Sequence, residues 1–148
     1  MLAALALLSA LGGQSAPPAS DIAGQYSFLR EGEFLQIAVD GEKVGGIVSR
    51  LGDSDGDHGV ILDHFIVTGA LRGRQMTFVT AEIHAVWFEF SGRVERGPAK
   101  SRTEEGFYIL QGTLKRHSSD AEHREKLESR EVSFKSQPEG AAPNKPNR

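Results

Sequence analysis

Apolar and polar residues alternate along most of the chain, and this is the period of a β-strand with one buried face and one wet face. Phe88, Phe90, Gly92 and Val94 alternate with polar or charged residues. The segment 108–115 repeats the same order of aromatic, apolar, glycine and aliphatic residues at every second position. Glycine weakens a strand, so its place in both copies indicates sharp curvature, a bulge or a close approach of two backbones.

Eight segments have this strand character, and short turns separate most of them. They are 25–30, 34–39, 43–50, 60–68, 75–83, 86–95, 106–116 and 130–136. Asp40-Gly41, between the second and third, is a strong hairpin signal. In the segment 60–68, apolar residues occupy odd and even positions alike, so both faces of the strand would be apolar. This pattern predicts that the strand is buried or kinked. Eight consecutive antiparallel strands favour an up-and-down barrel, which leaves no open edge; the alternative is an antiparallel β-sandwich.

One segment does not follow the strand period. Ser119-Asp120-Ala121-Glu122 matches a helix capping box, with Ser before the first turn and Glu three residues later. A polar stretch continues from there to Arg130. We therefore expect a short exposed helix, or alternatively a mobile loop, between the last two strands.

The strand pattern is similar to that of calycin-type barrels, the lipocalins, avidins and related eight-stranded meanders. The likeness rests on Gly24-Gln25-Tyr26, on Gly45-Gly46-Ile47 and on the repeated Phe-x-Gly-x-Val strands, and it covers most of residues 22–136. Tyr26 stands where the lipocalin Gly-x-Trp opening has Trp. Because Trp87 is the only Trp, the avidin set of ligand-contacting tryptophans is absent, and biotin binding is not implied.

The N-terminal pattern indicates export. Leu2–Leu11 consists of Leu, Ala and one Ser, and as a helix it would rise about 15 Å, about half of a bilayer core. Small residues and Pro17-Pro18 follow, as in a signal peptide. We expect a signal peptide at residues 1–16, cleaved after Ser15 or Ala16, and a periplasmic or secreted protein.

The remaining chain divides into three parts. Residues 17–20 are expected to form a linker and residues 21–136 the folded β domain. The tail 137–148 contains Pro, Gly, Asn and Ala and no large apolar residue, so we expect it to be disordered. A length of 148 residues suits one such domain.

Composition excludes several classes of function. The absence of Cys excludes disulfides, cysteine-based zinc sites and thiol catalysis, and also a lipoprotein anchor after the signal segment. The net charge of −3 argues against a general nucleic-acid-binding protein. No other segment is apolar enough to span a membrane. The expected partner is therefore a small-molecule ligand or another protein.

An acidic loop is the most distinctive polar motif. Asp53, Asp55 and Asp57 lie at every second position, and alternate loop carboxylates can converge on one calcium ion. The loop differs from the EF-hand pattern, because its sixth position is His58 and its twelfth is His64. The alternative is a solvated hairpin tip rich in turn-forming residues. We therefore expect no cofactor, with calcium at this loop as the alternative.

Two histidines lie in or beside predicted strands. His64 and Asp63 point to opposite faces of an apolar segment, so we expect one of them to make an internal hydrogen bond. His84 ends a strand close to Trp87. His64 and His84 can be structural residues, polar contacts for a ligand, or ligands of a metal or haem. Glu82 could pair with His84 as acid and base, but no nucleophile motif accompanies them.

Two functions remain open. The first is an exported, non-enzymatic barrel that binds a small apolar or amphipathic ligand, because eight strands enclose room for side chains or one small ligand. The predicted ligand-contacting residues are His64, His84, Tyr26, Phe88, Phe90 and Tyr108. The second is an interaction module with a filled core, in which Trp87 faces outward as a contact; alternatively, Trp87 plugs the end of the barrel.

Overall fold

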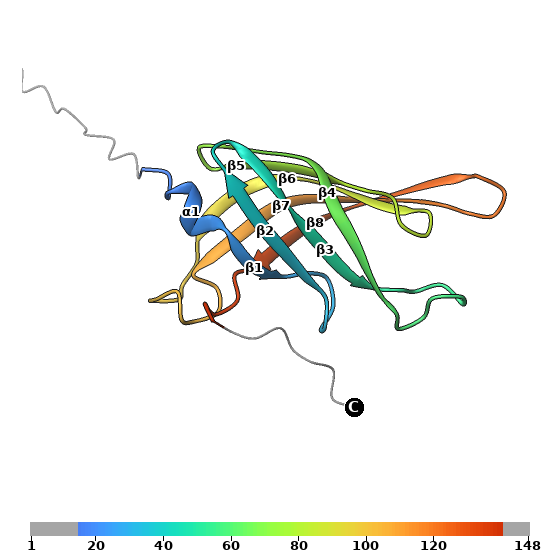
Figure 1. The fold of residues 1–148 in the computed structure, drawn as a ribbon, viewed down its shortest axis with the longest axis horizontal. Coiled ribbons are helices and arrows are strands. Elements are labelled where there is room, and N and C mark those ends of the chain that lie inside the picture. The colour runs from blue at the N-terminus through green and yellow to red at the C-terminus, as the bar shows by residue number, and fades with distance from the viewer. Residues whose placement is uncertain (1–14, 141–148) are drawn as a thin grey trace, which may run out of the picture.

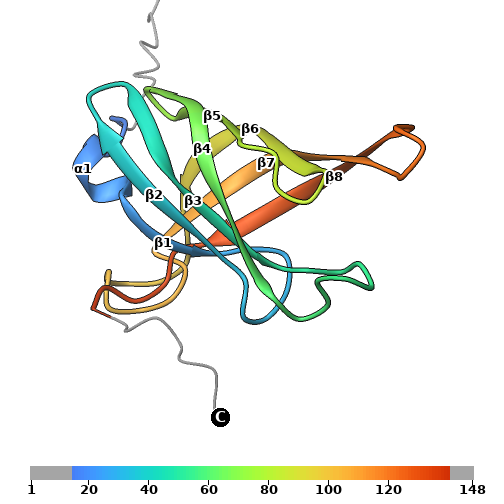
Figure 2. The same ribbon diagram turned by 45° about the vertical axis from the view of Figure 1, so that its right-hand side comes forward.

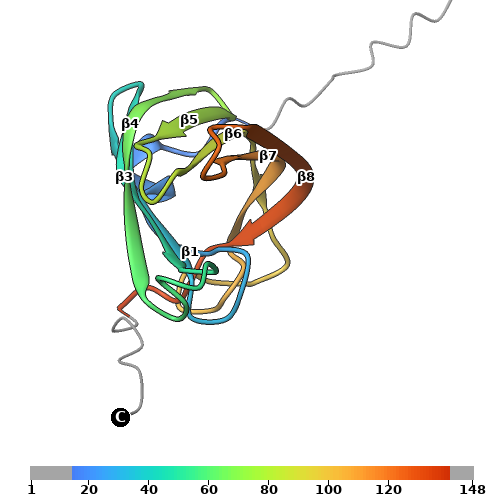
Figure 3. The same ribbon diagram turned by 90° about the vertical axis from the view of Figure 1, so that its right-hand side faces the viewer.

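The computed structural model describes residues 15–140 as one antiparallel sheet of eight strands in sequence order (Figure 1). The elements are α1 (Ala19–Ile22), β1 (Gly24–Ser27), β2 (Phe34–Asp40), β3 (Lys43–Leu51), β4 (Ile61–Arg72), β5 (Gln75–Thr80), β6 (Val86–Arg96), β7 (Tyr108–Ser119) and β8 (Glu125–Lys135). The sheet curls into a half-barrel (Figure 3). The predicted fold class and strand order are confirmed.

The inside of the half-barrel is filled by every second side chain of the strands. Phe88 and Phe90 on β6 are 1% and 2% exposed, as the alternation predicts. Trp87, next to Phe88 in the chain, faces outward and stacks on the His117 ring of β7, with 3.5 Å between ring centroids. Trp87 therefore lies on the outer face of the sheet and does not plug the barrel.

The repeated strand glycines mark a close backbone approach. Gly92 of β6 pairs directly with Gly112 of β7. A Cβ atom on Gly92 would lie 2.3 Å from the carbonyl oxygen of Gln111, and one on Gly112 would lie 2.3 Å from that of Ser91. No side chain fits at either position without a backbone shift, which explains why glycine recurs in the two copies.

The two edges of the sheet meet over a short distance. β1 has four residues and β8 has eleven. A bridge joins Tyr26 to Ser136, and the Lys135 amide donates to the Ser27 hydroxyl. The part of β8 before these contacts continues beside β7 alone, and its residues 125–131 are exposed. The half-barrel is thus open along one side, at the end away from α1 (Figure 2).

Of the two alternatives for the segment after Ser119, the short helix is not formed. The capping box does not begin a helix, because Ser119 ends β7 and β8 starts at Glu125. The Asp120 carboxylate accepts from the amides of Glu122 and Arg124 and closes a hairpin turn instead, so the same capping chemistry serves a different backbone.

The segment 60–68 is kinked but not buried on both faces. The register of β4 against β5 shifts between Ile66 and Thr68. Ile61, Phe65 and Val67 on its outer face, the β4 stripe, are 51%, 60% and 62% exposed. Of the two alternatives, burial of both faces or a kink, the structure has the kink.

The ends of the described chain pack on the domain. Ala19 and Ser20 of the predicted linker belong to α1. Gln137 and Glu139 of the predicted tail donate backbone hydrogen bonds to Gln25 and Arg102. Apart from its last two residues, the predicted signal peptide lies outside the described residues. Within residues 15–140, no helix is long and apolar enough to cross a membrane.

Candidate functional site

A pocket of about 390 Å³, here called the mouth pocket, lies on the open side of the half-barrel. Residues from the loop after β1, from the end of β3 and from β6, β7 and β8 line it together with Asp53. They are Phe28, Leu29, Arg30, Glu33, Arg50, Leu51, Asp53, Phe88, Arg116, Glu128 and Arg130. The pocket combines an apolar wall of four side chains with seven charged side chains.

Arg50 is the buried charge of the mouth pocket. It points inward because it shares the phase of Val44 and Val48 on β3, and it is 4% exposed. Its Nε donates to the His64 ring at 2.8 Å, and its Nη2 donates a long bond to the Ile83 carbonyl at 3.4 Å. Its Nη1 makes no hydrogen bond and is the one such buried side-chain atom in the described residues.

His64 supports Arg50 from behind. Its Nδ1 lies 2.9 Å from the Ala81 carbonyl, so it donates there and leaves Nε2 free to accept from Arg50. The ring is fully buried, and this burial lowers the pKa of His64. A neutral histidine therefore orients the guanidinium. The predicted internal hydrogen bond of this histidine is confirmed, and Asp63 lies on the exposed face beside Ser49.

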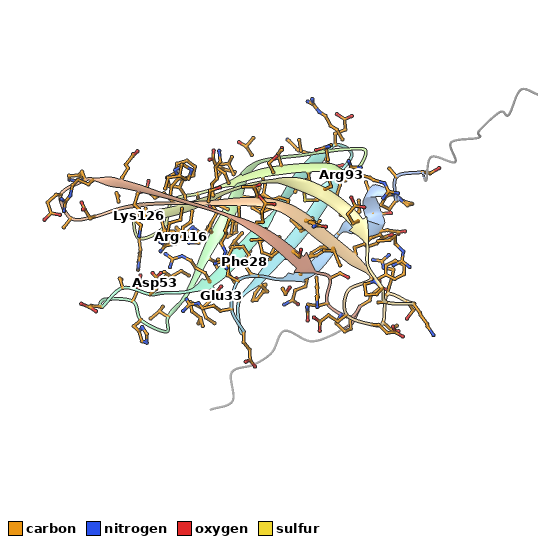
Figure 4. The ribbon with its side chains drawn as sticks, turned by 180° about the vertical axis from the view of Figure 1, so that it is seen from behind. Phe28, Glu33, Asp53, Arg93, Arg116 and Lys126 are labelled. Carbon is orange, nitrogen blue, oxygen red and sulfur yellow. The ribbon has the colours of Figure 1, made fainter. Side chains whose placement is uncertain are left out.

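Asp53 bridges two arginines at the edge of the mouth pocket. Its Oδ2 accepts from Arg116 Nη2 at 3.0 Å, whereas its Oδ1 lies 3.5 Å from Arg50 Nη1. Figure 4 shows Asp53 and Arg116 facing each other across this edge. Burial lowers the pKa of Arg50, and Asp53 partly opposes this effect. The Asp53 carboxylate is thus hydrogen-bonded to Arg116 but only loosely paired with Arg50.

The other acidic side chains of the mouth pocket already have partners. The Glu33 carboxylate is buried and accepts from Arg30 and from the Leu51 amide. Glu128 pairs with Arg116 and with Lys126 outside the pocket. Arg130 makes no ion pair within residues 15–140. Four arginines and three carboxylates line the pocket, a formal surplus of one positive charge.

The apolar wall consists of Phe28 and Phe88 together with Leu29 and Leu51. The two phenylalanine rings meet edge to face, with 5.4 Å between their centroids. Both are more than nine-tenths buried, so they form a rigid floor beside Arg50.

The predicted ligand-contacting residues do not gather at one site. Phe88 lines the mouth pocket and His64 lies behind it. Tyr26 and Tyr108 line a different pocket of about 260 Å³ beside α1. Phe90 stacks on Phe78 in the core, 2% exposed.

The acidic loop is organised by one of its three carboxylates. Asp57 is 4% exposed and accepts from the Ser54 amide and hydroxyl, at 2.9 and 2.6 Å, and lies 2.8 Å from the His84 ring. The hydrogen bonds from Ser54, followed by that from His84, hold the pKa of Asp57 well below its usual range. His84 therefore links the β5–β6 turn to this loop, and it is not among the residues that line the mouth pocket.

The three aspartates of the loop point to different partners. Asp53 faces the arginines, Asp57 faces Ser54 and His84, and Asp55 is exposed. In the described part of the chain, no three His, Asp or Glu side chains are grouped so that they could hold a metal ion. The calcium prediction has no preformed site in this arrangement.

The sequence analysis did not identify Arg50, Arg116 or Phe28. The signal was present for the two arginines, because Arg50 continues the inward phase of Val48 and Arg116 continues that of Leu114. An arginine at the inward phase of a strand end is a searchable pattern. Phe28 lies in a loop after β1, where alternation gives no guidance.

Comparisons with protein-family models, with curated proteins and with solved structures gave no match. The resemblance to calycin-type barrels therefore stays a prediction.

Proposed function

We propose that this protein is an exported, non-enzymatic binding protein that takes a small amphipathic ligand into the mouth pocket. The main supporting observation is the buried guanidinium of Arg50, which lines the pocket and whose buried Nη1 has no hydrogen-bond partner. A ligand with an acceptor group would complete the hydrogen bonds of Arg50 and cover the rings of Phe28 and Phe88.

Energetics support a binding role for Arg50. A buried polar group without a partner costs about 1–3 kcal/mol, and more when it is charged. Natural proteins contain few such groups. A chain that needed Arg50 for stability alone would supply a hydrogen-bonded carboxylate, as Glu33 does for Arg30. The unmet donor is better explained as the contact that a ligand completes.

Size supports the same function. Pockets for small molecules measure about 300–1,000 Å³ and combine apolar walls with a few placed polar groups. The mouth pocket, at about 390 Å³, is at the small end of that range. Its ligand would therefore be a compact molecule with one polar end.

Native mass spectrometry of protein purified from its own source tests this function. We expect the parent chain to retain a small molecule. Leu29→Trp should abolish retention, because the larger ring fills the mouth pocket. Leu127→Trp is the matched control, since Leu127 is 55% exposed and lies outside the pocket. A parent chain that carries nothing, and takes up no small amphipathic molecule when one is added, would contradict the proposal.

Export is the second part of the proposal, and the apolar run at residues 2–11 followed by small residues supports it. N-terminal sequencing of the protein from its native host tests it. We expect the mature chain to begin at Ala16 or Pro17 and to be recovered from the periplasm or the medium. Recovery of the intact N-terminus from the cytoplasm would contradict export.

The β4 stripe favours a second candidate function, a protein-interaction module. Ile61, Phe65 and Val67 expose apolar side chains along one strand, and exposed apolar patches often mark contact surfaces. Under this alternative, Phe65→Asp would abolish capture of a protein partner, whereas the control Leu127→Asp would not. Loss of small-molecule retention in Leu29→Trp would favour the first function over this one.

A further inference from the structure

We infer that the ligand of the mouth pocket is a monocarboxylate with a ring-sized apolar tail, and that its carboxylate replaces Asp53 between Arg50 and Arg116. This inference rests on the proposed function, because it names the chemical class of the ligand at the same site. In the described structure Asp53 acts as an internal stand-in for the ligand.

The two arginines define an incompletely filled carboxylate site. Asp53 offers one oxygen to each guanidinium, at 3.0 Å from Arg116 and 3.5 Å from Arg50. The second contact is too poorly aligned to be a hydrogen bond, and it leaves Arg50 Nη1 unsatisfied. Arginine binds planar carboxylates best through short, well-aligned bonds. A carboxylate that is free of the chain could approach both guanidinium groups.

The backbone around Asp53 explains the poor fit to Arg50. Gly52, its neighbour, donates to the Val60 carbonyl at 2.7 Å and accepts from the Gly59 amide at 3.1 Å. The Ser54 amide and hydroxyl are bound to Asp57. Hydrogen bonds on both sides thus fix the main chain, and a short aspartate side chain cannot move further inward. Because this side chain is 50% exposed, it can rotate into solvent when a ligand arrives.

Charge selects a negative ligand. The lining residues carry a formal surplus of one positive charge with Asp53 counted, and a surplus of two when Asp53 turns into solvent. A monocarboxylate replaces the one negative charge that Asp53 withdraws, whereas an uncharged ligand would leave Arg50 and Arg116 without it. The buried position of Arg50 makes that loss costly, because charges interact more strongly where water is excluded.

The apolar tail of the ligand is inferred from the position of the apolar wall of the pocket. Phe28 and Phe88 lie beside Arg50 in the same pocket and already meet edge to face. An aromatic ring packs favourably in such edge or offset arrangements. A carboxylate joined to a ring by a short chain therefore fits the arginines at one end and the phenylalanines at the other.

Titration calorimetry at low salt, with 4-phenylbutyrate and its neutral analogue 4-phenylbutan-1-ol as probes, tests the inference. We expect the acid to bind at least about tenfold more tightly, the difference that about one charge-assisted hydrogen bond supplies. Arg116→Gln should lower the affinity for the acid by about tenfold and leave the affinity for the alcohol nearly unchanged. Asp53→Asn should strengthen the acid several-fold, because it removes the competing carboxylate.

Arg93→Gln is the matched control. Arg93 is an exposed arginine paired with Glu95 on the same strand, and Figure 4 shows it at the other end of the molecule from Asp53 and Arg116. It removes the same charge without touching the mouth pocket, so affinity for the acid should stay within about twofold of the parent. Arg116 and Asp53 are partly exposed, so their variants are expected to fold.

The outcomes separate the inference from the proposed function. Equal affinity for the acid and the alcohol, or weaker binding of the acid by Asp53→Asn, would overturn the inference and leave an apolar-ligand pocket in place. Binding of neither probe by any variant would overturn the proposed function and the inference with it. Tight binding of the acid that Arg116→Gln and Arg93→Gln reduce equally would show a general charge effect and would also overturn the inference.

Discussion

The two ends of the half-barrel differ in whether their buried polar groups are fully hydrogen-bonded. At the α1 end, the Tyr26 hydroxyl is buried and donates to the Ile22 carbonyl at 2.6 Å. At the open end, the Arg50 guanidinium is equally buried, and its Nη1 has no hydrogen-bond partner. The first arrangement completes the hydrogen bonds of both groups within the fold. The second leaves a strong donor without an acceptor, on a side chain that lines a pocket.

The difference indicates that the α1 end has a structural role and that the open end is suited to binding. A satisfied buried hydrogen bond contributes to stability, because its loss leaves a partner unpaired. An unsatisfied buried charge lowers stability and is retained only where something else requires it. Four predictions test this contrast, in order of decreasing effect on the free energy of unfolding.

The wall that joins both ends should be the most sensitive part. Gly92→Val places a side chain 2.3 Å from the Gln111 carbonyl oxygen, and we expect a loss of about 3 kcal/mol or more in the free energy of unfolding. Urea denaturation measures it. Ser91→Val, on the exposed face of the same strand, is the control and should change stability little. Equal effects of the two variants would remove the close-approach explanation.

The α1 end should respond strongly to the loss of one hydroxyl. Tyr26→Phe leaves the buried Ile22 carbonyl without its donor, so we expect a loss of about 1–3 kcal/mol. Thermal or urea unfolding measures it. Tyr108→Phe is the control, because the Tyr108 hydroxyl makes no hydrogen bond within residues 15–140. A neutral Tyr26→Phe would mean that the α1 end does not depend on its internal bond.

Acidification should weaken the open end through His64. Burial lowers the folded-state pKa of His64, so the unfolded chain binds a proton first as the pH falls. The contribution of His64 to stability is therefore complete above about pH 6.5 and is lost below it, by at most about 1.4 kcal/mol per pH unit, until the lower folded-state pKa is reached. Urea unfolding between about pH 7 and pH 5 measures this loss.

His64→Gln is the control for the pH effect. A glutamine amide can accept from Arg50 and donate to Ala81 but does not titrate, so the variant should have a flatter pH profile. Parallel profiles for parent and variant would assign the pH dependence to other groups.

Arg50 should contribute least to stability although it is central to the proposed site. Replacement of a poorly paired buried charge by an apolar side chain of similar length is often neutral or stabilising. We therefore expect Arg50→Met to change the free energy of unfolding by less than about 1 kcal/mol while it abolishes binding of 4-phenylbutyrate. A loss of about 3–5 kcal/mol, the cost of breaking a well-paired buried ion pair, would make Arg50 a structural residue.

Local patterns predicted the strands well because alternation and turn chemistry act over a few residues. The pairing of Gly92 with Gly112 follows from two copies of one pattern, and the hairpin at Asp40-Gly41 from its turn residues. The capping box failed for the same reason. An aspartate that accepts backbone amides can begin a helix or close a hairpin, and only the strands on either side of Asp120 decide between them.

The candidate site was harder to predict than the fold. His64 was recognised because a histidine in an apolar segment needs an internal partner. Which partner it finds depends on Arg50, a strand away, and on Ala81, which no local pattern connects to it. The four aromatic ligand contacts were predicted because they face inward, and the curl of the sheet places two of them, Tyr26 and Phe88, in different pockets.

The sequence by itself determined the all-β class, the order of the strands and which side chains face inward, because these depend on period and on short turns. Tertiary structure alone decided where the half-barrel stays open. That opening follows from the unequal lengths of β1 and β8, and at its edge Arg116 of β7 lies beside Asp53, which is three positions from Arg50. The cause is that the behaviour of a charged group depends on the groups around it, and those around Arg50 come from positions 3 to 66 residues away in the chain.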